Sequence, residues 1–552
     1  MLIVALTVAL AADEFEGLRF YYGDVHAHTG ASGDGGSSDI GSCERFSTGE
    51  AGTCGAYLDI AQIAKDNGLD FFASLDHVTS VAATTGEENF LAVFQHVNAA
   101  DDPTAGFVTV PGAEVFVELE DGSDIGHRSL LFFGDQATLD TLAMVDTQPS
   151  GSTSNAVADC GALDDFMTGL TAAFGPAFLI PHHPGVKKPM ATDWGCFEAA
   201  WQPVVEVYSE HGSSLDATSD FDVPWSGYFG GGTVMTALDP AGFGHRIGFV
   251  AGSDNHDTHP GQVCDLDTVQ DQPYGSGLTV MFQSASTTFD RTAIHDAMAE
   301  RRTYATTGPK LPLVVELRLV DGTVVGGMGE EVPLEAGQDL VVEARVPTDA
   351  VASILGIDAV GPAGVWAMSM SSAGTWQVTI PAAELPEHVF VDVEMDASVW
   401  WEGGCDDGGT STLDHVWSTP TWFDGAGADH DGDGYTTGEG DCDDDDARVN
   451  PGALEACAKA EADQDCDGIA AADDPDCFPD TGDTADTGDT ADTGTDTADT
   501  ASDDTGPVLP DPDSGDPGEP GPTHRCACES GGTALPALLC AALAPLWLRR
   551  RR

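Results

Sequence analysis

The stretch LRFYYGDVHAHTG, residues 18–30, joins an apolar run to a His-x-His pair. Its aromatic and aliphatic residues favour a buried strand, and the histidines come where that strand should end. Apolar residues at helical spacing follow in AYLDIAQIAKDNG, residues 56–68, and again in TAIHDAMAERR, residues 292–302. Further strand-like apolar runs lie between the two helical patterns, at residues 69–76, 107–114, 129–134, 177–182, 204–210 and 247–254.

Strand and helix patterns alternate through residues 18–310. Such alternation predicts an α/β fold with a mainly parallel sheet, and about seven strand-helix units favour a barrel. From residue 311 to residue 425 the pattern changes to short alternating strands with turn signals. This second part is therefore predicted to be a β-sandwich domain.

Polar residues of metal-binding type fall where the apolar runs end. In a parallel barrel the carboxyl ends of the strands meet at one face, so these side chains are expected to converge on one pocket. Imidazole and carboxylate ligands together suit zinc, manganese or iron, and a shared carboxylate can bridge neighbouring ions. The residues are Asp24, His26, His28, Asp76, His77, Glu114, His127, His182, His183, Glu206, His211, Asp254 and His256.

Several longer motifs carry a family resemblance. They are GDVHAHT, GLDFFASLDH, GHRSLLFF, VEVYSEHGSS, GSDNHDTHPG and RRTYATTG. Together they resemble the PHP (polymerase and histidinol phosphatase) metallohydrolases, and more closely their exported carbaryl-hydrolase-like branch of CehA/McbA type. The resemblance covers residue 20 to about residue 425. It implies a distorted (β/α)7 barrel with a site for two or three divalent transition metals, zinc, manganese or iron.

The resemblance also implies a ligand set. One ion would take His26, His28, Glu114 and Asp254; a second Glu114, His127 and His182; a third Asp34, His77 and His256. His182 is preferred because it stands two residues after Ile180, where the strand should end. His183 is the alternative, since the proline after it resembles the His-Pro of other branches. Two features depart from the family pattern: Leu75 replaces the usual Thr, and the loop around Asp34 is lengthened and Gly-rich.

The function implied is hydrolysis of a small-molecule ester by a metal-bridged hydroxide, with phosphoester and carbamate or carboxyl ester both open. Arg128, His211 and Glu206 are the candidate catalytic side chains, Arg128 or His211 for the developing negative charge. A surface ion pair is the alternative for Arg128, and a structural role is the alternative for Glu206 and His211. Two rival functions remain: a non-catalytic, metal-stabilised structural or adhesive surface protein, and a calcium-dependent glycan binder.

The charge of the chain is strongly acidic. Asp and Glu number 93 against 20 Lys and Arg, a formal net charge of -73. Such a surface excludes nucleic acid as a partner, because a polyanion would be repelled. Residues 429–521 alone hold 30 acidic and 2 basic residues.

An acidic, Cys-rich module is predicted at residues 429–480. Asp429, Asp431 and Asp433 alternate before a glycine, which resembles the opening of a calcium loop. Gly440 stands where an EF-hand loop needs Glu, so no EF-hand is predicted. With Asp441 and Asp443 in GDCDDDD, the module resembles the Asp- and Cys-rich metal-binding repeats of myxobacterial surface proteins. Calcium binding is predicted, with a disulfide-stapled acidic stalk as the alternative.

The two ends of the chain are predicted to be targeting segments. Residues 1–12 are typical of a secretory signal peptide. After a Thr-, Asp- and Pro-rich linker at residues 481–524, residues 525–552 resemble a myxobacterial sorting tail with a short apolar span and four arginines. A sorting protease is then a partner, and only this tail would contact a membrane. We expect an exported protein, attached at the cell surface or outer membrane or released outside.

Cysteine usage agrees with export. The chain has 13 cysteines, three of them in the tail, which leaves an even number for disulfides. Cys43 and Cys54 are expected to close one surface loop. The acidic module holds Cys442, Cys457, Cys466 and Cys477, and other pairings stay open.

Overall fold

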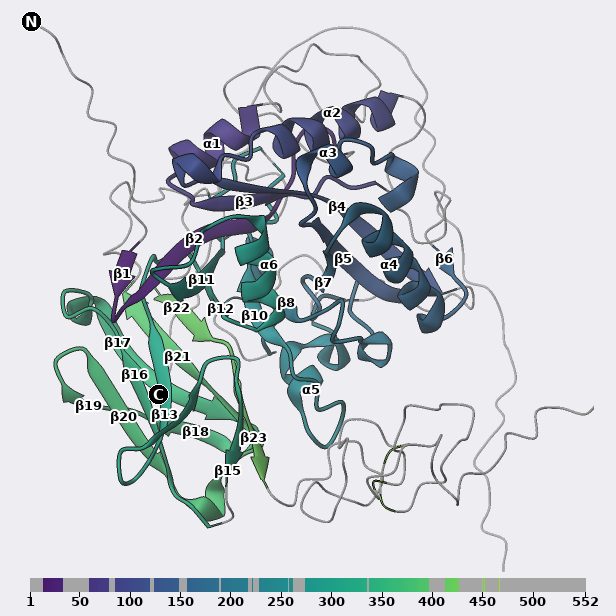
Figure 1. Cartoon of the computed structure of the whole chain (residues 1–552). Helices are drawn as coiled ribbons and strands as arrows, with labels where there is room; N and C mark the ends of the chain where they lie inside the picture. Colours follow the sequence, from purple (N-terminus) through teal and green to yellow (C-terminus); the bar gives the residue numbers. More distant parts are fainter. Residues whose placement is uncertain are drawn as a thin grey trace, which may run out of the picture. The chain divides into compact units, whose positions relative to one another are not determined.

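The protein is described by a computed structural model, which is strand-rich and mixed α/β (Figure 1). Two compact units divide the chain, Met1–Asp480 and Thr481–Arg552, and all described residues lie in the first. Those residues are 13–32, 59–78, 85–119, 124–147, 156–187, 190–216, 221, 228–256, 258–261, 274–334, 337–396, 413–425, 449, 451 and 466.

Several predictions lie outside the described residues. They concern the signal peptide, the linker and the sorting tail, together with Asp34, Cys43, Cys54, Asp429, Asp431, Asp433, Asp441 and Asp443. Cys466 of the acidic module is described and is disulfide-bonded.

The first part of the fold follows the predicted strand-helix alternation. Strands β2 (Leu18–Ala27), β3 (Phe71–Ser74) and β4 (Val108–Leu119) pair in parallel. Helix α1 (Ile60–Asp66) leads into β3, and α2 (Thr85–Ala99) leads into β4. Because each crossover helix covers the sheet, these strands are buried on both faces, which explains their nearly continuous apolar runs.

Strand β5 (Asp124–Phe132) departs from the expectation that every strand points the same way. It pairs antiparallel with β4 and with β7 (Ala177–Pro181). The segment between β4 and β5 is too short for a crossover helix, so the chain turns straight back as a hairpin. Strand β6 (Ala156–Val157) pairs with the end of β4, and helices α3 (Gln136–Leu139) and α4 (Cys160–Phe174) precede β7.

Strands β8 (Val204–Ser209), β9 (Gly212–Ser213) and β10 (Gly248–Ala251) form a separate small sheet, with α5 (Val234–Leu238) between β9 and β10. This sheet lies beside β7 at one edge and beside β11 (Leu278–Ser284) and β12 (Thr303–Thr306) at the other. The ladders between the described strands do not close into a ring. A mixed α/β fold is confirmed, whereas the closed (β/α)7 barrel stays a prediction.

Threonine hydroxyls supply hydrogen bonds along the edge of β10 that does not pair with β8. The Thr279 hydroxyl accepts from the Ala251 amide at 3.0 Å and donates to the Ala251 carbonyl at 2.7 Å. The Phe249 amide donates to the Thr419 hydroxyl at 2.8 Å, and the Thr303 hydroxyl donates to the Phe249 carbonyl at 3.0 Å. Buried backbone groups need partners, and here side chains supply them.

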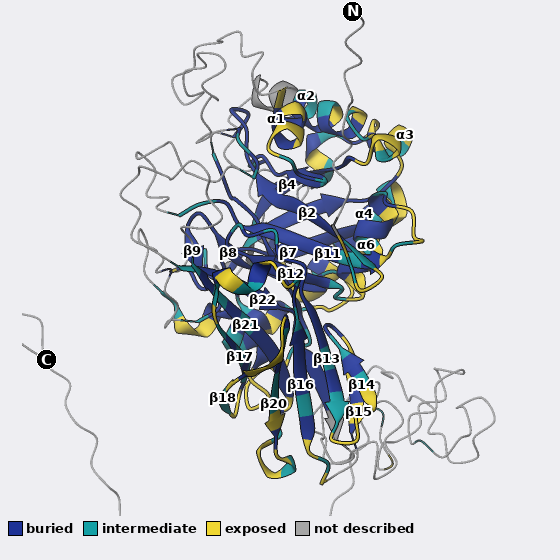
Figure 2. Cartoon of the chain, turned by 90° about the vertical axis from the view of Figure 1, so that its left-hand side faces the viewer, coloured by how far each residue is buried: buried dark blue, intermediate teal, exposed yellow. Residues whose placement is uncertain are grey.

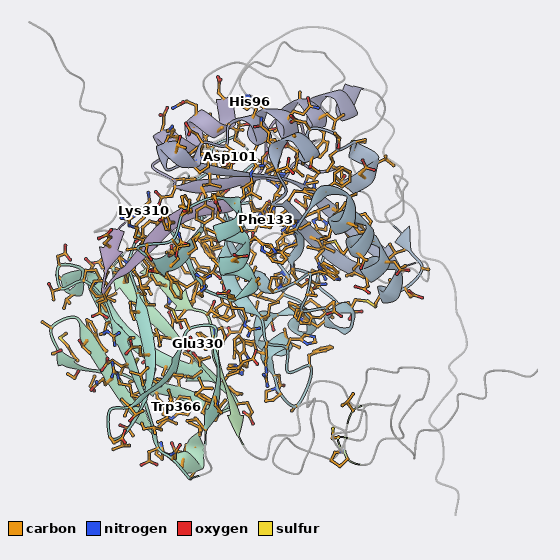
Figure 3. The ribbon with its side chains drawn as sticks, in the orientation of Figure 1. His96, Asp101, Phe133, Lys310, Glu330 and Trp366 are labelled. Atoms are coloured by element: carbon orange, nitrogen blue, oxygen red, sulfur yellow. A yellow bond between two sulfur atoms is a disulfide. The ribbon has the colours of Figure 1, made fainter. Side chains whose placement is uncertain are left out.

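The strands enclose an apolar core that supports the polar end of the sheet. Figure 2 shows the central strands buried, with exposed residues on the outer sides of the helices. Phe133, labelled in Figure 3, packs edge-on against Phe178 of β7 and His295 of α6 (Arg291–Ala299). This core also contains Val25, Phe71, Leu75, Val108, Val110, Leu131, Ile180, Val204, Val250 and Met281.

The described residues of the C-terminal part form strands and two short 3-10 helices, Ala350–Ser353 and Ala382–Glu384. One sheet has the order β14 (Val324–Gly327), β13 (Val314–Leu319), β16 (Leu340–Arg345), β20 (Thr375–Ile380) and β19 (Ser369–Ser372). A facing layer contains β17 (Ile354–Gly361), β18 (Gly364–Ala367), β21 (His388–Asp396), β22 (Leu413–Ser418), β23 (Thr421–Gly425) and β15 (Glu331–Leu334). Side chains from both layers share one buried cluster.

The facing layer is continuous with the first part of the fold. Strand β22 pairs with β12, β12 with β11 and β11 with β2, to which β1 (Asp13–Phe15) also pairs. The Lys310 ammonium, labelled in Figure 3, donates to the Gly68 carbonyl at 2.5 Å. Residues 310 and 311, the predicted domain boundary, thus lie between parts that share one sheet.

One disulfide joins described residues, Cys160 at the start of α4 to Cys196. Neither cysteine belongs to the pairs expected from the sequence. No helix within the described ranges is long and apolar enough to cross a membrane.

Candidate metal centre

Histidines and carboxylates from distant segments meet at one end of the first sheet. His26 and His28 stand two residues apart at the end of β2, so their side chains share a face. Backbone bonds join this end to the loop after β10: the Asp254 amide donates to the His26 carbonyl at 2.7 Å. Groups of potential ligand atoms within 4.8 Å of one another include His26, His28, His77, Glu114, His127, His182, His183, Glu206, His211, Asp254 and His256.

The first group consists of His26, His28, Glu114 and Asp254. The two Nε2 atoms lie 3.0 Å apart. The Nε2 atom of His28 lies 3.1 Å from Glu114 Oε2 and from Asp254 Oδ1, and that of His26 lies 3.4 Å from the same oxygens. Ligands about 2.0 Å from a tetrahedral ion are about 3.3 Å from one another. The group therefore has the dimensions of a single metal site.

Hydrogen bonds on the far side of each ring support this interpretation. His26 Nδ1 lies 2.9 Å from Glu206 Oε2, and His28 Nδ1 lies 3.0 Å from the Ser32 hydroxyl. When each Nδ1 atom donates, both Nε2 atoms carry lone pairs. Two lone pairs at 3.0 Å repel each other unless a positive centre lies between them, so the pair fits a cation.

The second group forms around the other oxygen of Glu114. Oε1 lies 2.5 Å from His127 Nδ1, 3.1 Å from His182 Nε2 and 3.4 Å from His77 Nδ1. Glu114 Oε1, His127 Nδ1 and both ring nitrogens of His182 are buried and find no hydrogen-bond partner of acceptable geometry among the described residues. Their lone pairs aim past one another, as ligand atoms around an ion do. Glu114 thus faces two groups with its two oxygens.

Both histidines of the IPHHP motif reach the second group. His182 makes the closer approach to Glu114, while His183 belongs to the same group of ligand atoms. His183 has a φ of 31°, a backbone conformation that non-glycine residues rarely adopt. This turn lets two consecutive residues lie near one group, so the choice between them stays open.

The third predicted set is placed in part. His77 and His256 lie with His28, and Asp34 is outside the described residues. Asp254 Oδ2 lies 3.2 Å from His211 Nε2. Asp254 also has a φ of 53°, and such strain is common at functional sites.

The buried carboxylates of the cluster favour positive charge on the groups beside them. Burial alone would lower the pKa of His28, but its hydrogen bonds to Asp254 and Glu114 raise the pKa to about 10. Burial would raise the pKa of Glu114, yet His77, His182 and His127 hold it well below its usual value. Burial lowers the pKa of His182 to about 3, so this ring is neutral and its lone pair is available. Protons on His28 are what an ion would displace.

Glu206 lies behind His26 rather than at an open position. It is buried, and Oε2 approaches the ring nitrogen that faces away from the group. Such a carboxylate orients a ligand and increases its basicity. Gly252 makes room for this contact, because a Cβ there would lie 2.5 Å from His26 Cβ.

Arg128, predicted as a candidate for charge stabilisation, points away from the cluster. Successive residues of β5 face opposite sides, and His127 faces the cluster. The Arg128 guanidinium donates to the His127 carbonyl at 2.9 Å and to the Thr192 hydroxyl at 3.1 Å. It is fully buried, so the surface ion pair is also excluded.

Two residues outside the predicted ligand set, Asp24 and Ser32, hold the cluster in place, although Asp24 is of metal-binding type. The Asp24 carboxylate accepts from the amides of His26, Ser253 and Gly261, which ties β2 to the loop after β10. The Ser32 hydroxyl contacts His28 and was not predicted to be functional. Its position four residues after His28 is a weak signal in the sequence, because the contact with Asp76 and His77 appears only in the structure.

Comparison with known proteins identifies one short region. The family model Cu-binding MopE, described as a "putative metal-binding motif", matches residues 441–472. No curated protein and no solved structure matches the chain. The match contains a metal-binding motif within the predicted acidic module and includes Asp441 and Asp443, while Asp429, Asp431 and Asp433 lie before it.

Proposed function

We propose that the protein is an exported metal-dependent hydrolase that cleaves an ester, either a phosphoester or a carbamate or carboxyl ester. The observation that carries this proposal is Glu114, whose two oxygens face two separate groups of imidazole nitrogens. A carboxylate in that position could help to hold two divalent ions, as in many two-metal hydrolases, whose ions lie about 3.5–4 Å apart. A purely structural site would close around one ion with fewer ligands.

Divalent ions held in the two groups would lower the pKa of a bound water and polarise the ester oxygen. The chain itself supplies orientation and charge. His77, His127 and His256 expose 13, 18 and 12% of their side chains, whereas His26, His28 and His182 expose none. The three partly exposed histidines therefore mark the side from which a substrate would approach. His211 lies on this side, in contact with Asp254 and near the ring of His256.

The deciding experiment combines metal analysis with substrate screening. Purified protein is expected to hold about two equivalents of a transition metal and to hydrolyse one class in a panel of phosphomonoesters, phosphodiesters, carbamates and aryl esters. His26→Ala and Glu114→Ala should each lose metal and activity together. His96→Ala, on α2 away from the cluster, is the matched control and should keep both (Figure 3). A full metal complement without turnover of any ester would favour the structural or adhesive alternative.

We also infer that the acidic module binds calcium and that the first part of the fold is a distorted barrel. Alternating carboxylates favour a hard cation, and residues 441–472 match a metal-binding motif. Calorimetric titration of the full chain with Ca²⁺ and with Cu²⁺ tests the module, with Asp441→Asn and Asp443→Asn as variants. We expect calcium binding to release or absorb heat and both variants to reduce that heat. Heat from copper alone would contradict calcium binding.

The position of β8 and β10 beside β7 and β11 supports the distorted barrel that we infer for the first part of the fold.

A further inference from the structure

We propose that Ser32 and Asp76 form a positioning relay that fixes His28 in the tautomer whose Nε2 atom faces the metal group. This inference rests on the proposed function and adds residues that the ligand set does not contain. Asp76 stands in the Asp-His pair, yet it belongs to none of the groups of potential ligand atoms described above. Asp76 is 1% exposed, so it is not simply a surface carboxylate in contact with water.

The direction of each hydrogen bond in the relay follows from the backbone. The Thr29 amide can only donate, and it lies 2.7 Å from Asp76 Oδ1, so this oxygen is an acceptor. The Ser32 hydroxyl lies 3.0 Å from the same oxygen and must therefore donate to it. The single hydroxyl hydrogen of Ser32 is thus directed at Asp76, whatever the protonation of the other carboxyl oxygen.

The remaining contacts of Ser32 are then fixed as well. Its hydroxyl oxygen can only accept from its other partners, which are the His77 amide at 3.0 Å and His28 Nδ1 at 3.0 Å. His28 must consequently carry a hydrogen on Nδ1. When the ring is neutral, as a metal ligand must be, its Nε2 atom is left with the lone pair, 3.1 Å from both Glu114 Oε2 and Asp254 Oδ1.

The same hydroxyl links two positions of the cluster. Ser32 holds the ring of His28 and the backbone of His77, whose Nδ1 atom lies 3.4 Å from Glu114 Oε1. A second anchor keeps Asp76 in place, because the Thr29 hydroxyl lies 2.9 and 2.8 Å from its two oxygens. The relay therefore sets a tautomer and a spacing at once, which a simple packing contact does not do.

Four substitutions distinguish the effect of the direction of the Ser32 hydrogen bonds from the effect of the Asp76 charge. Ser32→Ala removes the acceptor, and Asp76→Ala frees the Ser32 hydroxyl to donate to His28, which would put the lone pair on the wrong nitrogen. Ser32→Thr keeps the hydroxyl, and Asp76→Asn keeps an acceptor oxygen without the charge. Metal affinity is measured by chelator competition, and the ligand field by the visible absorption of the Co²⁺-loaded protein.

Ser32→Ala and Asp76→Ala are expected to weaken metal affinity by about 10- to 100-fold and to alter the Co²⁺ spectrum. Ser32→Thr and Asp76→Asn should stay within a few-fold of the wild type with an unchanged spectrum. Wild-type affinity in Ser32→Ala, or equal losses in Asp76→Asn and Asp76→Ala, would overturn the relay while leaving the metal site intact. If Asp76→Ala does not fold, the comparison of Ser32→Ala with Ser32→Thr decides. A wild-type protein that binds no transition metal would refute the proposed function instead.

Discussion

His26 Nδ1 lies 2.9 Å from Oε2 of Glu206, on the side of the ring that faces away from the other ligand atoms. Glu206→Gln keeps an acceptor but removes the charge that makes the imidazole a stronger ligand. We expect metal affinity to fall by about 10-fold or more without complete loss. Chelator competition measures this change, and Glu198→Gln, on the exposed surface, is the control. Unchanged affinity would show that Glu206 only fills space.

Metal binding should depend steeply on pH. In the ion-free protein His28 has a pKa of about 10, because Asp254 and Glu114 outweigh the effect of burial, so it is protonated at neutral pH. A metal ion must displace that proton, and apparent affinity should rise about tenfold per pH unit for each proton released up to about pH 10. Calorimetry in buffers of different ionisation heat counts the protons. Binding without proton release would contradict the assignment of His28 as a ligand.

Arg128→Met should affect stability slightly and the metal site not at all. The guanidinium is fully buried on the face opposite the cluster, and two of its nitrogens, Nε and Nη2, find no acceptor among the described residues. Burial lowers the pKa of Arg128 to about 9, which reflects the cost of keeping this charge inside. Replacing it by an apolar side chain is expected to change the free energy of unfolding by less than about 2 kcal/mol. Thermal melting and metal content check the result; loss of metal would restore a role at the site.

The Cys160–Cys196 disulfide should stabilise the fold strongly. It closes a loop with a sequence separation of 36 residues, for which loop entropy predicts about 4 kcal/mol. The Cys160→Ser, Cys196→Ser double variant is expected to lose much of that free energy of unfolding. Denaturant unfolding of the wild type with and without reductant measures this loss. The double variant lacks the bond, so it is the control for any other effect of reductant.

His388 should make the protein less stable in acid. It is 1% exposed, and burial lowers its pKa from 6.5 to about 4. Below pH 6.5 the unfolded chain takes up a proton that the folded chain refuses, so stability falls as the pH drops toward 4. The total loss in the free energy of unfolding is about 3 kcal/mol. The difference in unfolding free energy between the wild type and His388→Gln should shrink across this interval. A difference that does not change with pH would refute the assignment.

Sequence reasoning predicted the strands that carry the ligands better than it predicted their surroundings. Runs such as residues 18–24 and 204–210 are apolar because both faces of those strands are buried, so periodicity located β2 and β8 well. The approach of His26, His28 and Asp254 to one another could be anticipated, since each lies at or just after the end of a strand. Glu114 instead lies within β4, which continues to Leu119.

Other features could not be predicted, because they depend on tertiary contacts. The reversal of β5 depends on a turn too short for a helix. Arg128 lies on the face opposite the cluster because it follows His127 in that strand. The Cys160–Cys196 pairing needs the packing of α4 against the segment after β7. The role of Ser32 follows from hydrogen-bond directions that only a three-dimensional arrangement defines.

Because threonine hydroxyls hold β10, a single amino-acid substitution can change how Asp254, three residues after that strand, is positioned. A ladder of backbone bonds survives almost any substitution, since every residue offers the same amide and carbonyl. On the edge of β10 that does not pair with β8, Thr279, Thr303 and Thr419 supply those bonds, and a Thr→Val replacement would delete one while preserving shape. Selection can therefore adjust how firmly the Asp254 carboxylate is held without changing any residue of the candidate metal centre.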